Sequence, residues 1–293
     1  MTKIIKLSVA IATFNEERNI GRCLESVRRL ADEIVVVDES STDKTREIAK
    51  LYGAKVYETA HSPIFHVTKQ KALDYSTGEW ILQLDADEKV TPKLAQEIKE
   101  VLRMSSDRIR ERRPVDKKKW QLFQRHQQLI EKRDGTIGEK SGEVVAFFIP
   151  RLNYFLGKPL IHAGVYPDGV IRLIKNGKAL FPAKSVHEQI QVNGGIAWLF
   201  ENLEHYDSPT LARYFQRMAR YTNLQAADFE REKINRNVFG LLYFSAIKPW
   251  LVFFNLYARH KGFLDCWQGF LWSFLSALHF PIAYFKYLNK NRE

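Results

Sequence analysis

The sequence predicts an α/β protein with a doubly wound sheet, followed by an aromatic-rich helical region that associates with a membrane. Three observations support this prediction. Short apolar runs alternate with helix-like segments through the first hundred residues, polar clusters follow three of those runs, and residues 239–287 hold 16 of the 37 aromatic side chains but only five charged ones. Strand–helix alternation at this spacing is typical of sheets joined by right-handed crossovers. The 293 residues suffice for one large domain or two modest ones.

The predicted elements follow from local patterns of apolar and polar residues. Four short apolar runs are predicted to be strands, at residues 7–12, 34–37, 54–57 and 80–84. The second is a β-branched run of the kind that is buried on both faces of a parallel sheet. Helices are predicted where apolar residues recur at helical spacing or capping side chains precede them: over residues 20–30, after the cluster 40–43, over 69–76, and after Thr91-Pro92.

Polar clusters follow the first, second and fourth predicted strands, at residues 13–16, 38–43 and 85–88. Because ligands bind at the carboxyl ends of the strands in doubly wound sheets, these clusters predict one binding site. Asp85 and Asp87 can hold a hard divalent cation that keeps open positions for a pyrophosphate. Chance, or capping of the helix that follows, is the alternative explanation for this pair.

Asp38 closes the second predicted strand. It either caps the following helix or accepts a hydrogen bond from a nucleotide base or ribose, and the neighbouring Ser, Thr and Asp side chains can already supply the cap. The sequence contains neither G-x-x-x-x-G-K-[ST] nor G-x-G-x-x-G, so neither a P-loop nor a dinucleotide fingerprint explains the phosphate chemistry. Cys23 and Cys266 are the only cysteines, which excludes a disulfide framework and a cysteine-rich zinc site.

The formal net charge of +11 predicts an anionic partner. Residues 1–102 carry 15 basic and 17 acidic side chains, so the whole basic excess lies in residues 103–293. A nucleic-acid-binding protein usually spreads its basic side chains over its main domain, so no nucleic acid is expected. Residues 103–140 hold 12 basic and 6 acidic side chains and are expected to form a solvated helix or a mobile loop, with a lid or a membrane contact as the alternative. After strands and turns over 144–181, an amphipathic helix is expected over 196–227.

The C-terminal region is expected to meet a membrane. Residues 266–285 carry no charge for 20 positions, about the length that spans a bilayer. Polar residues and a proline interrupt this run, and its aromatic side chains are not banded at its ends, so an interfacial or re-entrant position is favoured over a true span. A soluble helical core or an oligomer interface is the third alternative. The chain opens without the pattern of a cleavable signal peptide, so its catalytic part is expected to face the cytoplasm.

Three segments carry a family resemblance: AIATFNE at residues 10–16, VVVDESSTDKT at 35–45 and GEWILQLDAD at 78–87. In order and spacing they resemble the N-terminal motifs of the family 2 inverting glycosyltransferases, which have the GT-A fold. The resemblance implies a GT-A type mixed sheet, a UDP-sugar donor and a divalent cation, Mg²⁺ or Mn²⁺. The residues that it places at the donor are Thr13, Phe14, Asn15 and Glu16 in the nucleotide pocket, Asp38 at the uracil, Asp85 near the ribose and the metal, Asp87 at the metal and pyrophosphate, and Lys71 as a further contact.

Weaker matches in the second half refine the expected branch. Residues 169–173, 186–188 and 262–265 resemble the branch of lipopolysaccharide-core β-glucosyltransferases. The Q-x-x-R-W signature of processive synthases is absent from the sequence, which favours a single sugar transfer. An inverting transfer needs one general base to deprotonate the acceptor hydroxyl. By its position in the resemblance Glu188 is the expected base, with Asp168 as the alternative.

Two further side chains have both a functional and a structural interpretation. His187 either completes the metal shell or orients the donor, or it is a hydrogen-bonded structural histidine. Arg172 either pairs with a phosphate of the donor or acceptor, or it forms a surface ion pair. The GT-A domain is expected over residues 1–235, with 103–140 as a basic insertion or lid, and the membrane-associating helical tail over 236–293.

The sequence therefore predicts a metal-dependent inverting glycosyltransferase that moves glucose from a UDP-sugar to a membrane-borne glycolipid such as the inner core of lipopolysaccharide. It is expected on the anionic cytoplasmic face of the inner membrane, as a peripheral or monotopic protein. A glycosyltransferase acting on polyprenyl phosphate is the nearest alternative. An inactive membrane-bound scaffold and a nucleic-acid-binding protein are more distant ones, and the retained acidic residues argue against the scaffold.

Overall fold

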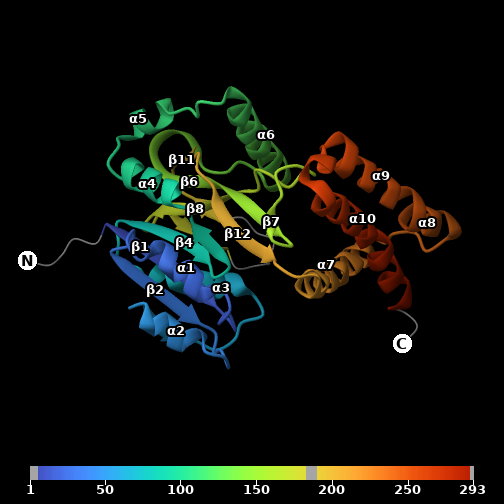
Figure 1. Ribbon diagram of the computed structural model, residues 1–293, viewed down its shortest axis with the longest axis horizontal. Coiled ribbons are helices and arrows are strands. Elements are labelled where there is room, and N and C mark those ends of the chain that lie inside the picture. Colours follow the sequence, from blue (N-terminus) through green and yellow to red (C-terminus); the bar gives the residue numbers. More distant parts are fainter. Residues whose placement is uncertain (1–5, 183–189, 291–293) are drawn as a thin grey trace, which may run out of the picture. The chain divides into compact units, whose positions relative to one another are not determined.

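A computed structural model describes residues 6–182 and 190–290 of the chain (Figure 1). Its internal contacts divide the chain into two compact units. The N-terminal unit comprises Met1–Arg151 and Pro167–His205, and the C-terminal unit comprises Leu152–Tyr166 and Tyr206–Glu293.

The N-terminal unit is organised around one sheet. Four parallel strands form one side of it in the order β3–β2–β1–β4: β1 (Leu7–Thr13), β2 (Glu33–Asp38), β3 (Lys55–Glu58) and β4 (Trp80–Asp85). These are the four predicted strands, and β1 and β2 are buried along their whole length. The sheet continues through β8 (Gly169–Lys175), β6 (Glu139–Phe155), β12 (Leu203–Ser208) and β5 (Glu88–Val90). Because β4 pairs antiparallel with β8, and β8 with β6, the sheet is mixed.

Helices connect the parallel strands: α1 (Ile20–Val27), α2 (Thr45–Leu51) and α3 (Phe65–Asp74), while α4 (Pro92–Val101) follows β5. The buried side chains of α1 are at the spacing of one helix face, namely Ile20, Cys23, Leu24 and Val27. Burial of each large aliphatic side chain contributes about 1.5–3 kcal/mol. Thr91 caps α4 as predicted, because its Oγ1 accepts the backbone N–H of Leu94 at 3.1 Å.

The charge-dense segment after α4 is mostly helical and contains α5 (Ser106–Glu111) and α6 (Lys117–Asp134). Phe123 anchors α6, since its buried ring stacks on Trp198 with 4.5 Å between the ring centroids. The amphipathic helix expected over 196–227 begins later, because β11 (Gly195–Trp198) and β12 occupy its first part and pair with β6 and β5. The remaining strands are short: β7 (Lys158–Pro159), β9 (Ala179–Leu180) and β10 (Gln191–Val192).

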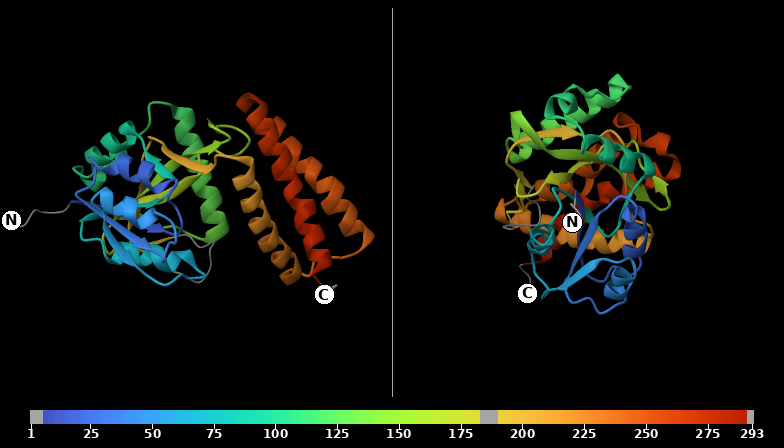
Figure 2. Two further views of the ribbon diagram at one scale, coloured as in Figure 1. Left: turned by 60° about the horizontal axis from the view of Figure 1, so that its bottom comes forward. Right: turned by 90° about the vertical axis from the view of Figure 1, so that its left-hand side faces the viewer.

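The C-terminal unit is mostly helical. Its long helices are α7 (Leu211–Arg231) and α10 (Cys266–Asn289). Between them lie a continuous helical segment, α8 (Val238–Leu242), η1 (Tyr243–Ile247), α9 (Lys248–Phe254) and η2 (Asn255–Arg259), and the 3₁₀ turn η3 (Gly262–Asp265). α10 packs against both α7 and α9 (Figure 2). The core between them is aromatic, because the ring of Phe244 lies 4.8 Å from Phe229 and 5.0 Å from Tyr284. The contacts therefore group α7 with the C-terminal helices.

Among the described residues, the helical segment Val238–Arg259 is the one that is long and apolar enough to cross a membrane, judged by length and composition alone. Its most apolar 18-residue window has a mean hydropathy of 1.4, and none of that window is buried. The uncharged run at 266–285 lies instead in α10, where Ser273, Leu275 and Tyr284 are buried. The exposed apolar surface is therefore at residues 238–259, before the uncharged run 266–285 that was expected to meet the membrane. That run lies in α10, whose buried side chains form part of the core of the helical unit.

Candidate functional site

The carboxyl ends of β1, β2 and β4 lie side by side at one edge of the sheet. In the parallel register Thr13 is opposite Asp38, and Ala12 is opposite Asp85. The three polar clusters that follow these strands are therefore neighbours, although they are far apart in the sequence. This edge, where ligands bind in doubly wound sheets, holds the candidate site.

Asp38 joins the loops that follow β1 and β2. Its carboxylate is fully buried and accepts hydrogen bonds from Thr13 Oγ1 at 2.7 Å, from the backbone N–H of Ser41 at 2.7 Å and from Ser41 Oγ at 2.6 Å. Asn15 has a φ of 54°, a left-handed conformation that Asn tolerates better than most residues. Its Oδ1 accepts the backbone N–H of Thr42 at 2.8 Å. The two loops are therefore fixed to each other by side chains.

The other residues predicted to line the nucleotide pocket lie on the same loops. The Phe14 ring is partly exposed, and its centroid lies 4.6 Å from that of His61. The backbone N–H of Glu16 donates to Thr45 Oγ1 at 2.8 Å. The structure thus brings residues 13–16 together with the loop after β2.

Two lysines of α3 contact different neighbours. Lys71 Nζ donates to Thr59 Oγ1 at 2.5 Å, whereas Lys69 Nζ lies 2.5 Å from Asp85 Oδ1. Residues two positions apart on a helix point about 200° away from each other, so only one of the two can face β4. Lys71, the predicted donor contact, therefore lies at Thr59, and the cation beside Asp85 is Lys69.

Asp85 is surrounded by cations. Arg172 Nη2 lies 2.5 Å from Asp85 Oδ2 and 2.7 Å from Glu88 Oε1. Burial alone would raise the pKa of Asp85, but Arg172 and then Lys69 hold that pKa well below its usual range. Asp85 is therefore ionised and its charge is paired within the protein. The Arg172 side chain is only 7% exposed, so it forms a buried ion pair instead of the surface pair considered from the sequence.

A second arginine extends this network to Asp168. Arg151 Nη1 lies 3.4 Å from Glu88 Oε1, and Arg151 Nη2 lies 2.8 Å from Asp168 Oδ2. Glu88 is fully buried, and a buried carboxylate is tolerated when cations and hydrogen bonds pair it, as Arg151 and Arg172 do here. Asp168, the alternative base, is thus linked to the strand-end site through Arg151.

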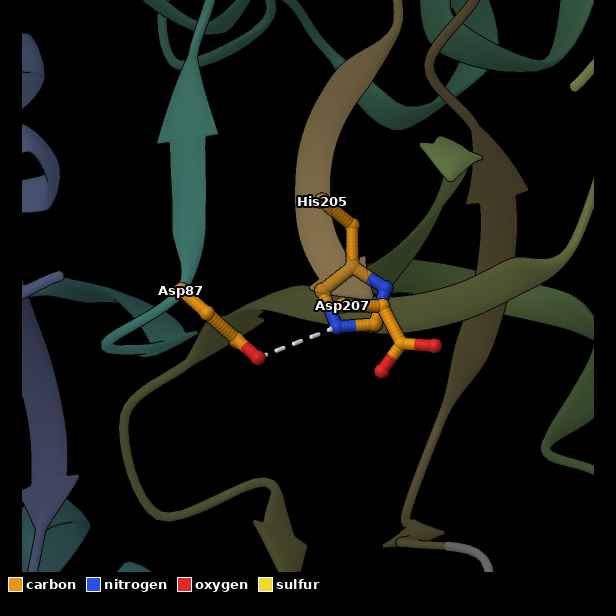
Figure 3. A group of neighbouring side chains, drawn as sticks. All are labelled: Asp87, His205 and Asp207. Carbon is orange, nitrogen blue, oxygen red and sulfur yellow. Dashed lines mark ion pairs between the residues drawn. The ribbon is translucent and has the colours of Figure 1, made fainter. Parts of the chain in front are cut away.

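Asp87 forms a group with two side chains of β12 (Figure 3). β12 pairs antiparallel with β5, which places His205 opposite Glu88 and its Nε2 at 3.5 Å from Asp87 Oδ2. Asp207 lies two residues further along the same strand and therefore on the same face. One ligand atom from each of the three side chains lies within 4.8 Å of the others. Burial alone would raise the pKa of Asp87, but the hydrogen bond with His205 lowers it.

The donor set of this group suits a divalent cation. Carboxylates are ligands that suit Mg²⁺ and Mn²⁺, and a neutral imidazole is the commonest side-chain ligand of metal ions. Ligand atoms that share one ion at about 2.0–2.2 Å lie at most roughly 4.4 Å apart, so the three atoms, which lie within 4.8 Å of one another, would reach a single ion after small side-chain movements. Asp85, which the resemblance places near the metal, is paired with Lys69 and Arg172 and is not part of this group. Asp207 also pairs with Arg217.

Two predicted residues, His187 and Glu188, lie outside the described part of the chain. Glu88 lies in the predicted polar cluster 85–88 but was not predicted as a site residue, and neither His205 nor Asp207 was predicted. His205 and Asp207 alternate along a strand and so share one face, a pattern that points to a site only where a strand is expected. Residues 196–227 were expected to be helical, and on a helix residues 205 and 207 would not share a face.

Comparisons with known proteins identify the family of the chain. The model of the family described as glycosyl transferase family 2 matches residues 8–153, about half of the chain. An uncharacterised glycosyltransferase of Rickettsia typhi is 42% identical over 95 residues, which are 32% of this chain and 32% of that protein. The chain therefore matches about a third of the length of this relative. LpsC, a lipopolysaccharide core biosynthesis glycosyltransferase of Rhizobium meliloti, is 26% identical over 288 residues, 93% of this chain and 91% of that protein.

One solved structure illustrates a more limited likeness. A glucosyl-3-phosphoglycerate synthase of Mycobacterium tuberculosis has 26% sequence identity over 29% of this chain and 34% of its own, with a TM-score of 0.27. The family match is the broader finding, since it begins in β1, ends in β6 and contains the polar clusters after β1, β2 and β4. The chain belongs to the family 2 glycosyltransferases.

Proposed function

We propose that this glycosyltransferase is a metal-dependent inverting enzyme that moves glucose from a UDP-sugar to a membrane-borne glycolipid such as the inner core of lipopolysaccharide. The observation that carries the proposal is the group Asp87, His205 and Asp207 at the carboxyl edge of the sheet, beside the pocket loops after β1 and β2. LpsC, which matches most of the chain, is named for lipopolysaccharide core biosynthesis, and this supports a glycolipid acceptor.

The proposed donor lies along the strand-end site. Its nucleotide contacts the loops after β1 and β2, and its diphosphate lies at Asp87, His205 and Asp207. A divalent cation bound there would neutralise the diphosphate as the leaving group. Lys69 and Arg172 lie beside this site, and Asp85 orients both because it contacts each of them at 2.5 Å.

The proposed general base takes the proton of the acceptor hydroxyl. A single displacement inverts the anomeric centre and needs one such base. We assign this role to Glu188, on its position in the family resemblance, and keep Asp168 as the alternative. Asp168 already pairs with Arg151 at 2.8 Å, and an ion pair opposes protonation of a carboxylate. Glu188→Gln should therefore abolish turnover and retain UDP binding, whereas Asp168→Asn should retain turnover. Retained turnover in Glu188→Gln would move the role to Asp168.

A donor screen tests the chemistry. Calorimetry with UDP-glucose, UDP-galactose and GDP-mannose, each with Mn²⁺, Mg²⁺ or EDTA, identifies the nucleotide and the metal requirement. We expect cation-dependent binding of UDP-glucose that is lost in Asp87→Ala and retained in Asp74→Asn. Asp74 is a matched control because its carboxylate accepts an exposed hydrogen bond from Gln70 and lies at the far end of α3. Binding of no nucleotide sugar would end the proposal.

The proposed acceptor is reached at the membrane surface. The apolar segment Val238–Arg259 is unburied, and among its exposed side chains are Phe239, Trp250 and Phe254. Exposed aromatic side chains with basic residues nearby are typical of helices that lie in the interface of an anionic bilayer. The basic excess of residues 103–293 supports the same partner. We therefore place the enzyme on the cytoplasmic face of the inner membrane, as a peripheral or monotopic protein.

Vesicle sedimentation tests this placement. Trp250→Glu should reduce binding to vesicles that contain phosphatidylglycerol, because it puts a charge into the apolar surface. Leu51→Glu is the matched control, since Leu51 is a highly exposed apolar residue of α2 in the other unit. Transfer to extracted lipopolysaccharide core lipid is expected, and transfer to polyprenyl phosphate alone would favour the alternative acceptor. Equal vesicle binding by wild type and Trp250→Glu would refute the membrane surface.

A further inference from the structure

Part of the basic charge of residues 103–140 is used inside the N-terminal unit. Arg112 pairs with Glu97, a buried carboxylate of α4. Lys119 Nζ donates to the carbonyl oxygen of Phe200 at 2.5 Å. Both cations are engaged by groups of the same unit, so their charge is not offered to a partner.

A second group of cations lies on the outer face of α6. Three basic and two apolar side chains recur there at positions i, i+4, i+7, i+11 and i+14, which share one face of a helix. We call this set the α6 stripe, and its members are Lys118, Leu122, Arg125, Leu129 and Lys132. All five are exposed, and the exposed fraction is 38% for Leu122 and 59% for Leu129. Within residues 6–182 and 190–290, none of the three cations forms an ion pair.

The opposite face of α6 is fixed to the sheet. The buried ring of Phe123 stacks on Trp198 with 4.5 Å between the ring centroids. Gln127 Oε1 accepts the indole N–H of Trp198 at 3.0 Å. His126 Nε2 accepts the backbone N–H of Gly169 at 2.9 Å, and burial lowers the pKa of His126, which favours the neutral ring that can accept. The helix is therefore held against the sheet at several points, and the α6 stripe faces away from the unit.

The chemistry of the α6 stripe fits the surface of an anionic bilayer. Lysine and arginine side chains near such a surface are attracted to the lipid headgroups, and leucine side chains enter the boundary between headgroups and acyl chains. A polyanion in solution, such as a nucleic acid, would use the cations but would offer nothing apolar to the two leucines. At 1.5 Å per residue the stripe is about 21 Å long, so all five side chains can meet one flat surface. The mixture of cations and leucines therefore favours a bilayer.

We propose that the α6 stripe is a membrane-contact surface of the N-terminal unit, which binds the headgroup layer of an anionic bilayer. This deepens the membrane placement in the proposed function, on which it rests for its partner. That placement uses residues 238–259 of the C-terminal unit, whereas the α6 stripe gives the N-terminal unit a contact of its own.

The proposed contact lies close to a residue of the candidate site. His126, on the inner face of α6, accepts the N–H of Gly169, the residue that follows Asp168. A helix with its side chains is about 10 Å wide. A bilayer bound to the α6 stripe would therefore lie about one helix width from the segment that carries Asp168, where a membrane-borne acceptor can reach it.

Sedimentation of the full chain with vesicles tests the α6 stripe. The vesicles contain phosphatidylcholine alone or phosphatidylcholine with phosphatidylglycerol. Arg125→Gln should weaken binding to the anionic vesicles about fivefold, because one cation near such a surface contributes about that factor. Leu129→Gln should weaken the same binding about fivefold or more, because it removes a leucine that the bilayer would bury. Binding to phosphatidylcholine alone should change less in Arg125→Gln, since that surface carries no net charge.

Two matched controls lie in the same unit. Lys93→Gln removes an exposed cation of α4, and Leu51→Gln removes an exposed leucine of α2. Neither residue belongs to the α6 stripe, so both variants should bind vesicles as wild type does. A weakening in the controls equal to that in the α6 variants would show a nonspecific effect of charge or polarity and would overturn the inference.

The two α6 variants also separate a bilayer from other partners. If the stripe binds a soluble polyanion or an acidic protein instead, vesicle binding should be normal in Leu129→Gln, and this result would overturn the inference. Normal vesicle binding in Arg125→Gln would overturn it as well. Binding that Trp250→Glu reduces but neither α6 variant changes would remove this inference and leave the proposed function intact. A wild type that does not bind the anionic vesicles would remove the membrane placement together with it.

Discussion

Replacing Arg172 by methionine should destabilise the N-terminal unit strongly. Arg172 is buried and contacts Asp85 at 2.5 Å, Glu88 at 2.7 Å and the side-chain oxygen of Gln83. Breaking a buried ion pair by removing one partner typically costs about 3–5 kcal/mol, because it leaves an uncompensated buried charge. Lys69 still pairs with Asp85, so we expect a loss of about 2–4 kcal/mol in the free energy of unfolding.

Urea unfolding measures this loss, and Lys175→Met is the matched control. Lys175 is on the same strand, β8, and its Nζ lies 2.6 Å from a carboxylate oxygen of Glu143, but both side chains are more exposed than that of Arg172. Surface ion pairs contribute about 0–1 kcal/mol, so this variant should lose less than about 1 kcal/mol. The reasoning is refuted if the two variants lose equal stability, or if Arg172→Met loses less than its control.

Three further outcomes are expected. Burial alone would raise the pKa of Glu33, but hydrogen bonds, that of Lys55 first, lower it to about 2 from 4.5. The contribution of ionised Glu33 to the free energy of unfolding is therefore fully present above about pH 4.5, and up to about 3 kcal/mol of it is lost as the pH falls through 2. In Glu33→Gln, the free energy of unfolding measured in urea should depend less on pH in this range. His205→Ala should lose Mn²⁺ binding, followed by electron paramagnetic resonance, with the unfolding midpoint little changed; retained Mn²⁺ would exclude it as a ligand. Gly78→Ala should lower the melting temperature, because its Cβ would lie 2.6 Å from the backbone nitrogen of Ser8, and an unchanged value would show that the backbone yields there.

The elements that the sequence predicted well depend on local patterns. The β-branched run in β2 and the Thr91-Pro92 start of α4 each carry their signal within a few residues. The helix expected over 196–227 was wrong in its first part, because pairing of β11 with β6 and of β12 with β5 overrides the local periodicity. Such pairing joins segments that are far apart in the sequence, so a local pattern does not contain it.

The same distinction applies to the site. Thr13, Asp38 and Asp85 could be placed together because the ends of neighbouring parallel strands must meet at one edge. Asp87 and His205 meet only through the antiparallel pairing of β5 with β12, which no local pattern revealed. Which of the two lysines contacts Asp85 depends on the rotation of α3 about its axis. The sequence around Lys69 and Lys71 does not reveal that rotation.

Binding of UDP with and without a divalent cation tests the central claim most directly. The group Asp87, His205 and Asp207 is proposed to hold the cation on which the donor diphosphate depends. We expect wild type to bind UDP by calorimetry with Mn²⁺ and to lose that binding in EDTA, and we expect Asp87→Ala to bind UDP weakly in both conditions. Equal UDP affinity for wild type and Asp87→Ala with Mn²⁺ would contradict the account, as would wild-type binding that EDTA leaves unchanged.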